Sequence, residues 1–110
     1  MKTYQIKITK QARRHLLGIR DYIAKELLAP ETARDMIALL KEKISSLSEM
    51  PDRIKLTEEE PWRSDGIHQM RVKNYYIYFW IDEEHRVVQI TAVIYVMRDQ
   101  FAQLEKMELE

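Results

Sequence analysis

The sequence of 110 residues contains no cysteine, only two glycines and three prolines, and no long apolar run. Without cysteine, a disulfide scaffold, a thiolate zinc site and a cysteine nucleophile are all excluded. Gly18 and Gly66 stand far apart, which excludes the glycine-rich phosphate-binding loops of P-loop and Rossmann proteins. The longest apolar run, residues 75–81, is strand-length and far shorter than the roughly 20 residues of a membrane-spanning helix. We therefore expect a cytoplasmic protein without membrane contacts.

The chain also lacks net charge, since 18 basic residues balance 18 acidic ones. A uniformly basic nucleic-acid-binding protein is therefore not indicated. The charges are unevenly distributed, however: residues 1–20 hold basic residues and no acid, whereas residues 49–65 are predominantly acidic. This pattern predicts a positive and a negative side, which permits contact with a polyanion. The three histidines have no metal-ligand spacing, so we expect neither a metal site nor a cofactor.

The length of 110 residues fits a single domain, residues 1–110, and hydrophobic periodicity predicts that it begins with a strand and two helices. Apolar residues alternate over residues 3–9, which is typical of a half-buried strand. From residue 11 they recur every three or four positions as far as Leu27, and again over residues 33–47, which predicts two helices. Pro30 suits the first turn of the second helix. The very short break before it predicts an antiparallel helical hairpin.

Three more strands are predicted at residues 67–73, 75–81 and 87–97, and their tight turns make them an antiparallel meander. A short C-terminal helix follows, with Asp99 as its N-cap and with anchors at Phe101, Leu104 and Met107. The predicted fold class is therefore α+β, in the order strand, helix, helix, three strands and short helix. In this fold an antiparallel sheet packs on the helical hairpin.

Strand alternation predicts which side chains share a face of the sheet. On the last strand one face is expected to carry Val88, Ile90, Ala92, Ile94 and Val96. The face away from the helices is expected to be more open and to carry Arg71, Lys73, Tyr95 and Met97. The aromatic residues of 75–80 are typical of a core, and the alternative is a stacking platform for bases.

The loop at residues 51–66 offers two further candidates. Glu58, Glu59 and Glu60 form a run that is typical of a solvated loop, and the alternative is that one of them acts as a general base. Trp62 either anchors this loop or contacts a partner.

Arg71, Lys73, Tyr95 and Arg98 form the most informative set, because they would converge if their strands are neighbours. Metal-free cleavage of RNA needs a deprotonated 2′-hydroxyl, a balanced phosphorane charge and a protonated leaving oxygen. The arginines could balance the charge, and Tyr95 could donate a proton or hold the nucleophile. The alternative is that all four residues line a solvated face of the sheet.

Residues 71–82, 87–90 and 93–99 form a meander that resembles the RelE/ParE toxin superfamily, and the opening strand and helical hairpin fit it as well. The resemblance implies a toxin of a type II toxin–antitoxin system, neutralised by a cognate antitoxin. RelE-like members cut ribosome-bound mRNA, and ParE-like members inhibit DNA gyrase. We expect a metal-independent, ribosome-dependent mRNA endonuclease (an mRNA interferase), and the alternative is a gyrase inhibitor without catalytic activity. A degenerate, non-toxic binding partner is a third interpretation.

The resemblance also implies site residues. The expected catalytic residues are Arg71, Tyr95 and Arg98, and the expected RNA-binding residues are Lys73, Arg63, Lys7 and Arg13. Tyr76 stands where such nucleases usually carry an arginine, and Met97 replaces a frequent basic residue. We expect an acidic antitoxin to cover the basic residues 1–20, with a helix or strand of the antitoxin in an apolar groove beside the sheet.

Overall fold

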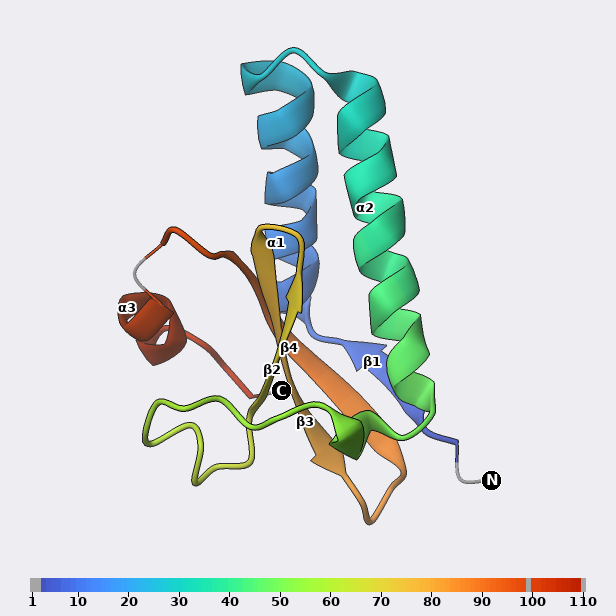
Figure 1. The fold of residues 1–110 in the computed structure, drawn as a ribbon, viewed down its shortest axis with the longest axis vertical. Coiled ribbons are helices and arrows are strands. Elements are labelled where there is room, and N and C mark those ends of the chain that lie inside the picture. Colours follow the sequence, from blue (N-terminus) through green and yellow to red (C-terminus); the bar gives the residue numbers. More distant parts are fainter. Residues whose placement is uncertain (1–2, 99, 110) are drawn as a thin grey trace.

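The predicted order of elements is confirmed by a computed structural model, which describes residues 3–98 and 100–109 (Figure 1). Short 3₁₀ turns at Ser46–Ser48 and Pro51–Arg53 follow the second helix. The predicted N-cap Asp99 lies outside the described residues, as does the side chain of Phe101. The main elements are β1 (Gln5–Ile8), α1 (Lys10–Asp21), a π-helical turn (Tyr22–Glu26), α2 (Pro30–Ser45), β2 (His68–Val72), β3 (Tyr75–Asp82), β4 (Val87–Tyr95) and α3 (Gln100–Glu105).

The four strands form one sheet in the order β1-β4-β3-β2. The predicted antiparallel meander is confirmed for β2, β3 and β4. The opening strand β1 pairs with β4 in parallel, so the whole sheet is mixed rather than purely antiparallel. A parallel neighbour needs a long crossover connection, and the helical hairpin supplies it.

The helical hairpin begins at Thr9, which joins α1 to the sheet. The Thr9 hydroxyl accepts a hydrogen bond from the Ala12 amide as the N-cap of α1, and it donates to the Ile90 carbonyl of β4 at 2.9 Å. Pro30 occupies the first turn of α2, as predicted. In Figure 1 the two helices run side by side, and their connecting end extends well beyond the sheet.

The prediction that Leu27 continues the buried stripe of the first helix is wrong. The α-helix ends at Asp21, and the π-helical turn that follows changes the angle between successive side chains. Leu27 is 56% exposed and Leu28 is 83% exposed. The reason is that this end of the hairpin lies past the edge of the sheet, where no core faces it.

A β-bulge at Thr91 changes which side chains of β4 share a face. Phe79 of β3 is opposite Ile90, while the preceding residue Tyr78 is opposite Ala92, so Thr91 has no partner on β3. The hydroxyl of Thr91 instead donates to the Tyr78 carbonyl at 3.1 Å. The predicted single face for Val88 through Val96 is therefore wrong beyond this residue.

Two hydrophobic clusters cover the two faces of the sheet. The larger cluster lies under the hairpin and takes Val88, Ile90 and Val93 from β4. The smaller cluster lies on the opposite face, where Ala92 and Ile94 meet partners from the loop and the C-terminal segment: Trp62, Ile67, Leu104 and Met107. The expectation of an open face away from the helices is therefore wrong, because α3 and the loop cover it.

The loop between α2 and β2 is fixed by its own side chains. Trp62 is 7% exposed within the smaller cluster, so it anchors the loop. The Glu60 carboxylate accepts from the Ser64 amide and from the Ser64 hydroxyl, and these bonds lower its pKa. Glu60 therefore holds a turn of the loop, and its lowered pKa does not suit the alternative role of a general base.

Candidate functional site

An open cavity of about 850 Å³ lies between the hairpin and the end of the sheet where β4 finishes. Its lining combines apolar, aromatic and basic side chains, and no acidic residue is found among the described residues that line it. Concave sites of this size are large enough for a small molecule or a segment of a partner chain. The polar and aromatic side chains that line it include Arg14, His15, Tyr22, Thr32, Asn74, Tyr75, Tyr95, Arg98 and Gln103.

His15 connects α1 to β4 at the base of this cavity. The Val93 amide donates a hydrogen bond to Nδ1 of His15 at 3.1 Å. Since β1 pairs with β4 only as far as Ile90, this amide has no strand partner on that side, and the imidazole takes that place. An accepting Nδ1 fixes the neutral tautomer with its hydrogen on Nε2. His15 therefore offers a donor, rather than a lone pair, at its second nitrogen.

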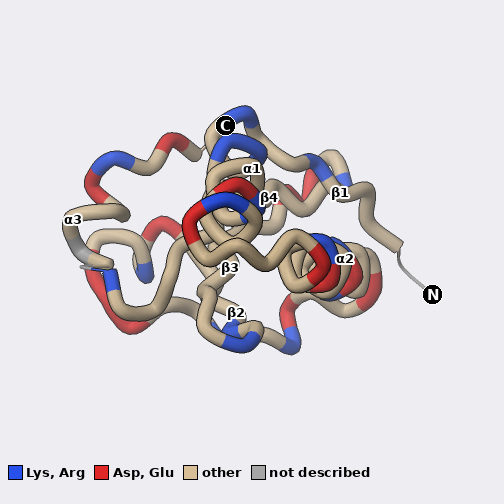
Figure 2. The backbone as a smooth tube through the Cα atoms, turned by 90° about the horizontal axis from the view of Figure 1, so that it is seen from above, with Lys and Arg blue, Asp and Glu red and all other residues tan. Residues whose placement is uncertain are grey.

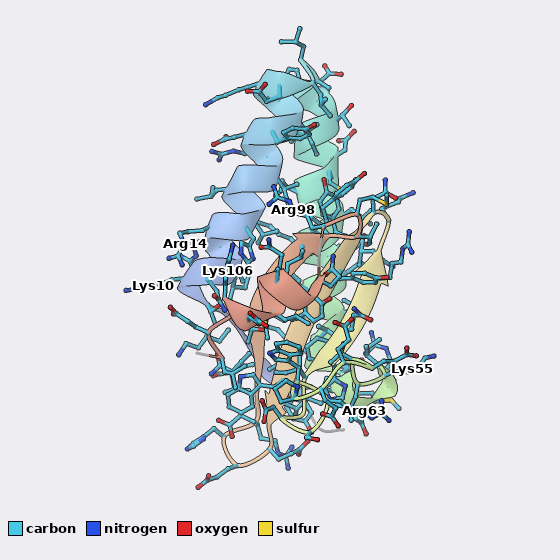
Figure 3. The ribbon with its side chains drawn as sticks, turned by 90° about the vertical axis from the view of Figure 1, so that its left-hand side faces the viewer. Lys10, Arg14, Lys55, Arg63, Arg98 and Lys106 are labelled. Carbon is cyan, nitrogen blue, oxygen red and sulfur yellow. The ribbon has the colours of Figure 1, made fainter. Side chains whose placement is uncertain are left out.

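Two guanidinium groups act on His15 from different elements. Burial lowers the pKa of His15, and the charges of Arg14 and Arg98 lower it further. Both arginines are exposed and line the cavity. Neither guanidinium has a hydrogen bond or an ion pair with any residue that the structure describes. Figure 3 shows Arg14 on α1 and Arg98 at the end of β4.

Two tyrosines form the aromatic side of the cavity. Tyr75 and Tyr95 are opposite each other on β3 and β4, and their rings meet edge to face with centroids 5.8 Å apart. Burial raises the pKa of Tyr75, and Tyr95 and Tyr22 raise it further. Tyr75 therefore stays protonated at neutral pH and acts only as a neutral hydrogen-bonding group.

The structure separates the three residues that were predicted to be catalytic. Arg71 is opposite Tyr76, and Tyr76 is opposite Ile94, so these three share the face of the smaller cluster. Tyr95 is opposite Tyr75, which belongs to the larger cluster under the hairpin. The expected convergence is therefore wrong: Tyr95 and Arg98 line the cavity, and Arg71 lies on the other face.

The face assignment follows from the bulge at Thr91. Without it, strict alternation would place Tyr95 on the face that carries Arg71. On that other face the Arg71 guanidinium lies 5.9 Å from the centroid of the Tyr76 ring, and its Nε donates to the Lys73 carbonyl. Arg71 is therefore held against β3 and the turn before it.

The predicted RNA-binding residues do not gather on one surface either. Lys73 occupies the β2–β3 turn with a left-handed backbone (φ 55°), and Lys7 extends from β1. Arg63 lies in the loop near the end of the sheet remote from Arg98 (Figure 3). Arg13 is exposed on α1 but does not line the cavity. Figure 2 shows basic positions around α1 and β1 and both signs of charge along α2.

The sequence indicated part of this site and missed the rest. It identified Tyr95 and Arg98, which follow a strand, and it placed Arg14 on a basic side. It gave His15 no role beyond an ordinary position on a helix. The available signal was the helical spacing of His15 with Ala12, three residues before it, and Ile19, four residues after it, which turns the imidazole partly toward the sheet.

The other histidines have local partners. Nδ1 of His68 lies 2.7 Å from the Ile54 carbonyl, and the ring stacks on Phe79 at 5.0 Å. His85 pairs with the Asp82 carboxylate at 2.9 Å, which lowers the pKa of Asp82. Among residues 3–98 and 100–109, no group of three or more His, Asp or Glu is arranged to hold a metal ion. The same residues include no helix long and apolar enough to span a membrane.

Comparison with solved structures gives the same fold. The chain is similar to a chromosomal ParDE toxin–antitoxin structure from P. aeruginosa, with a TM-score of 0.71, 19% identity, and coverage of 87% of this chain and 99% of that one. It is also similar to the RelBE2 toxin–antitoxin complex from Mycobacterium tuberculosis, with a TM-score of 0.59, 26% identity, and coverage of 84% and 98%. A mutant of the E. coli toxin RelE in the free state gives a TM-score of 0.57 at 16% identity, with coverage of 94% and 97%.

Comparison with protein families is more specific. No curated protein sequence matches this chain. The family model for the ParE toxin of type II toxin–antitoxin systems (parDE) matches residues 6–100. This range includes all four strands, except for the first residue of β1, and both helices of the hairpin. It also includes Arg14, His15 and Arg98. The chain therefore belongs to the ParE toxin family, within the RelE/ParE superfamily of type II toxins.

Proposed function

We propose that this toxin inhibits DNA gyrase by binding to it, without catalytic activity of its own. The observation that carries this proposal is the separation of Arg71 from Tyr95 and Arg98 by the sheet. A nuclease needs its charge-balancing and proton-transferring groups around one scissile phosphate. Both gyrase and the ribosome act in the cytoplasm, so the proposal places the toxin there.

The chemistry of the cavity also favours binding over cleavage. The Nδ1 lone pair of His15 is used by the Val93 amide, and Nε2 carries the hydrogen, so this histidine has no free lone pair to act as a base. Tyr75 stays protonated for the reason given above. The two guanidiniums of the cavity, on Arg14 and Arg98, balance charge but do not remove protons at neutral pH.

The overall charge supports the same choice. A protein that docks on ribosomal RNA gains affinity through phosphate contacts with many basic residues. This chain has no net charge, and its predicted RNA-binding residues are distributed over β1, α1, the loop and the β2–β3 turn. A protein target needs no such excess of positive charge.

Exposed apolar side chains on α1 and at the end of the hairpin supply a surface for a protein target. Leu17, Tyr22, Leu27 and Leu28 are between 44% and 83% exposed. Exposed apolar side chains that gather in one region are typical of a protein-binding surface. We infer that gyrase contacts α1 and the end of the hairpin, where Leu17 and Leu28, respectively, lie outside the cavity lining.

The test is a gyrase supercoiling assay with purified toxin and relaxed plasmid. We expect inhibition by the wild type and its loss in a Leu17→Ser/Leu28→Ser double variant that keeps the circular dichroism spectrum of the wild type. In parallel, mRNA 5′ ends are mapped in a purified translation system. New ribosome-dependent ends that vanish in Arg98→Ala, together with unaffected supercoiling, would replace this proposal with mRNA cleavage.

A further inference from the structure

We propose that Arg14, His15 and Arg98 form a carboxylate-binding site that recognises one acidic side chain on an otherwise apolar segment of the antitoxin. The inference rests on the assignment of the chain as a type II toxin with an antitoxin partner, and it adds where that partner docks and which chemistry is recognised. It does not depend on gyrase being the target.

The charge of the cavity supports an anionic group. Two guanidiniums from α1 and from the end of β4 line it, and the described lining residues include no acid. Neither guanidinium is paired with any residue that the structure describes. Hydrogen bonds between such groups and a carboxylate are about twice as strong as those between neutral groups. An incoming carboxylate would therefore meet two guanidiniums that are unpaired among residues 3–98 and 100–109.

The imidazole of His15 adds a directional donor to these charges. Because Nδ1 accepts from the Val93 amide, the hydrogen of the neutral ring is on Nε2. The charges of Arg14 and Arg98 help to keep the ring neutral, and all three side chains line the same cavity. A carboxylate between the arginines has a second oxygen with which to accept from Nε2.

The rest of the cavity has the properties of a groove for an apolar segment. Ile19 of α1, Ile23 of the π-helical turn and Met36 of α2 line one side, and Val93 and Ile94 of β4 line another. At the rim, Tyr22 and Leu27 are each 56% exposed. An amphipathic helix that lays apolar side chains into such a groove is a recurrent mode of peptide recognition. Apolar contacts with a single charge at one end fit the antitoxin better than a polyanion.

The neighbouring residue Arg13 distinguishes a specific site from a diffuse positive side. Successive residues of an α-helix differ in direction by about 100°, so Arg13 and Arg14 point to different parts of the surface. Arg14 lines the cavity, whereas Arg13 does not. Arg13→Glu and Arg14→Glu change the total charge equally. A diffuse interaction predicts equal losses of affinity, and the carboxylate site predicts unequal ones.

A second pair of variants separates the recognition role of His15 from its structural role. In His15→Asn the amide oxygen stands near the position of Nδ1 and can accept from the Val93 amide, but the Nε2 donor is lost. In His15→Ala both interactions are lost. The carboxylate site predicts that the asparagine variant keeps most of the stability of the toxin and still loses affinity.

The experiment is calorimetric titration of the purified toxin with its purified cognate antitoxin. We expect Arg14→Glu, Arg98→Ala and His15→Asn to weaken the affinity by about tenfold or more, since each removes a charge-assisted hydrogen bond. We expect Arg13→Glu to weaken it by less than about threefold, as a remote exposed charge does. Equal losses for Arg13→Glu and Arg14→Glu, or an unchanged affinity for His15→Asn, would overturn the proposal.

A titration of the free toxin checks the site without the antitoxin. The ring nitrogens of His15 are followed by NMR while sodium acetate or sodium chloride is added at equal ionic strength. We expect a saturable shift of Nε2 with acetate alone, and we expect Arg98→Ala to remove it. The same response to both salts would contradict a carboxylate site. Neither measurement contains gyrase, so a negative supercoiling assay leaves these results unaffected.

Discussion

At the scale of single residues, His15 links the stability of the fold to pH. In the unfolded chain its pKa has the ordinary value of 6.5, and in the folded protein burial and the two arginines lower it. The unfolded chain therefore binds more protons when the pH falls below about 6.5, and the free energy of unfolding decreases over that range until the folded pKa is reached. Protonation would also remove the acceptor that Nδ1 offers to the Val93 amide.

We therefore expect the wild type to lose stability between about pH 7.5 and pH 5.5, and His15→Asn to lose less, because asparagine does not titrate. The measurement is urea unfolding at both pH values for the two proteins. Asp82, whose pKa is lowered by His85, titrates at more acidic pH and leaves this window unaffected. Parallel pH dependence in the two proteins would show that His15 is not the titrating group.

The same residue illustrates the limit of reading a sequence. The period of α1 identified its buried positions Ala12 and Leu16, because burial of an apolar face produces that period. It could not reveal that a β4 amide lacks a strand partner, because that depends on where β1 ends in space. A single polar contact between elements distant in sequence produces no repeating pattern that could be recognised in the sequence. The pairing of His15 with the Val93 amide was therefore visible only in the structure.

At the scale of elements, the sequence predicted the helical hairpin correctly but assigned the faces of strand β4 only in part. Pro30 and the two apolar stripes were sufficient to predict the hairpin, because each signal is local. On β4, alternation predicted the faces correctly up to Ile90 and incorrectly from Ala92 onward. The reason is that Thr91 is an additional residue of β4 with no partner on β3. A run of apolar β-branched residues looks the same with or without a bulge. This one residue separated Tyr95 from Arg71.

The bulge can be tested by deleting Thr91. Deletion would restore strict alternation, so that Ala92 to Tyr95 would exchange faces and Val93 would leave the cluster under the hairpin. We expect a loss of more than about 3 kcal/mol of stability or a failure to fold, since several core contacts break together. Thr91→Ala keeps the residue count and loses the bond to the Tyr78 carbonyl, so we expect a cost of only about 1–2 kcal/mol. Urea unfolding measures the stability of both variants. An equal loss of stability in the two would contradict the proposal that the additional residue sets which side chains of β4 share a face.

At the scale of the whole molecule, the C-terminal segment joins parts of the chain that are far apart in sequence. The Gln11 side chain of α1 donates to the Glu108 carbonyl, and the indole of Trp80 on β3 donates to the Leu109 carbonyl at 2.7 Å. Met107 packs on the smaller cluster, with its sulfur 3.1 Å from the hydroxyl oxygen of Thr91. The segment thus closes the face of the sheet opposite the hairpin, whereas the cavity with Arg98 lies under the hairpin itself.

This arrangement predicts that removing residues 107–110 affects one face of the sheet more than the other. We expect a loss of about 2–4 kcal/mol, mainly from the contacts of the partly buried Met107 with the smaller cluster. The indole hydrogen of Trp80 should exchange with solvent faster, because its acceptor at Leu109 is gone. The indole of Trp62, which is 7% exposed, serves as the internal control. NMR hydrogen exchange resolves the two indoles, and equal acceleration of both would mean that the whole smaller cluster, rather than the segment alone, had opened.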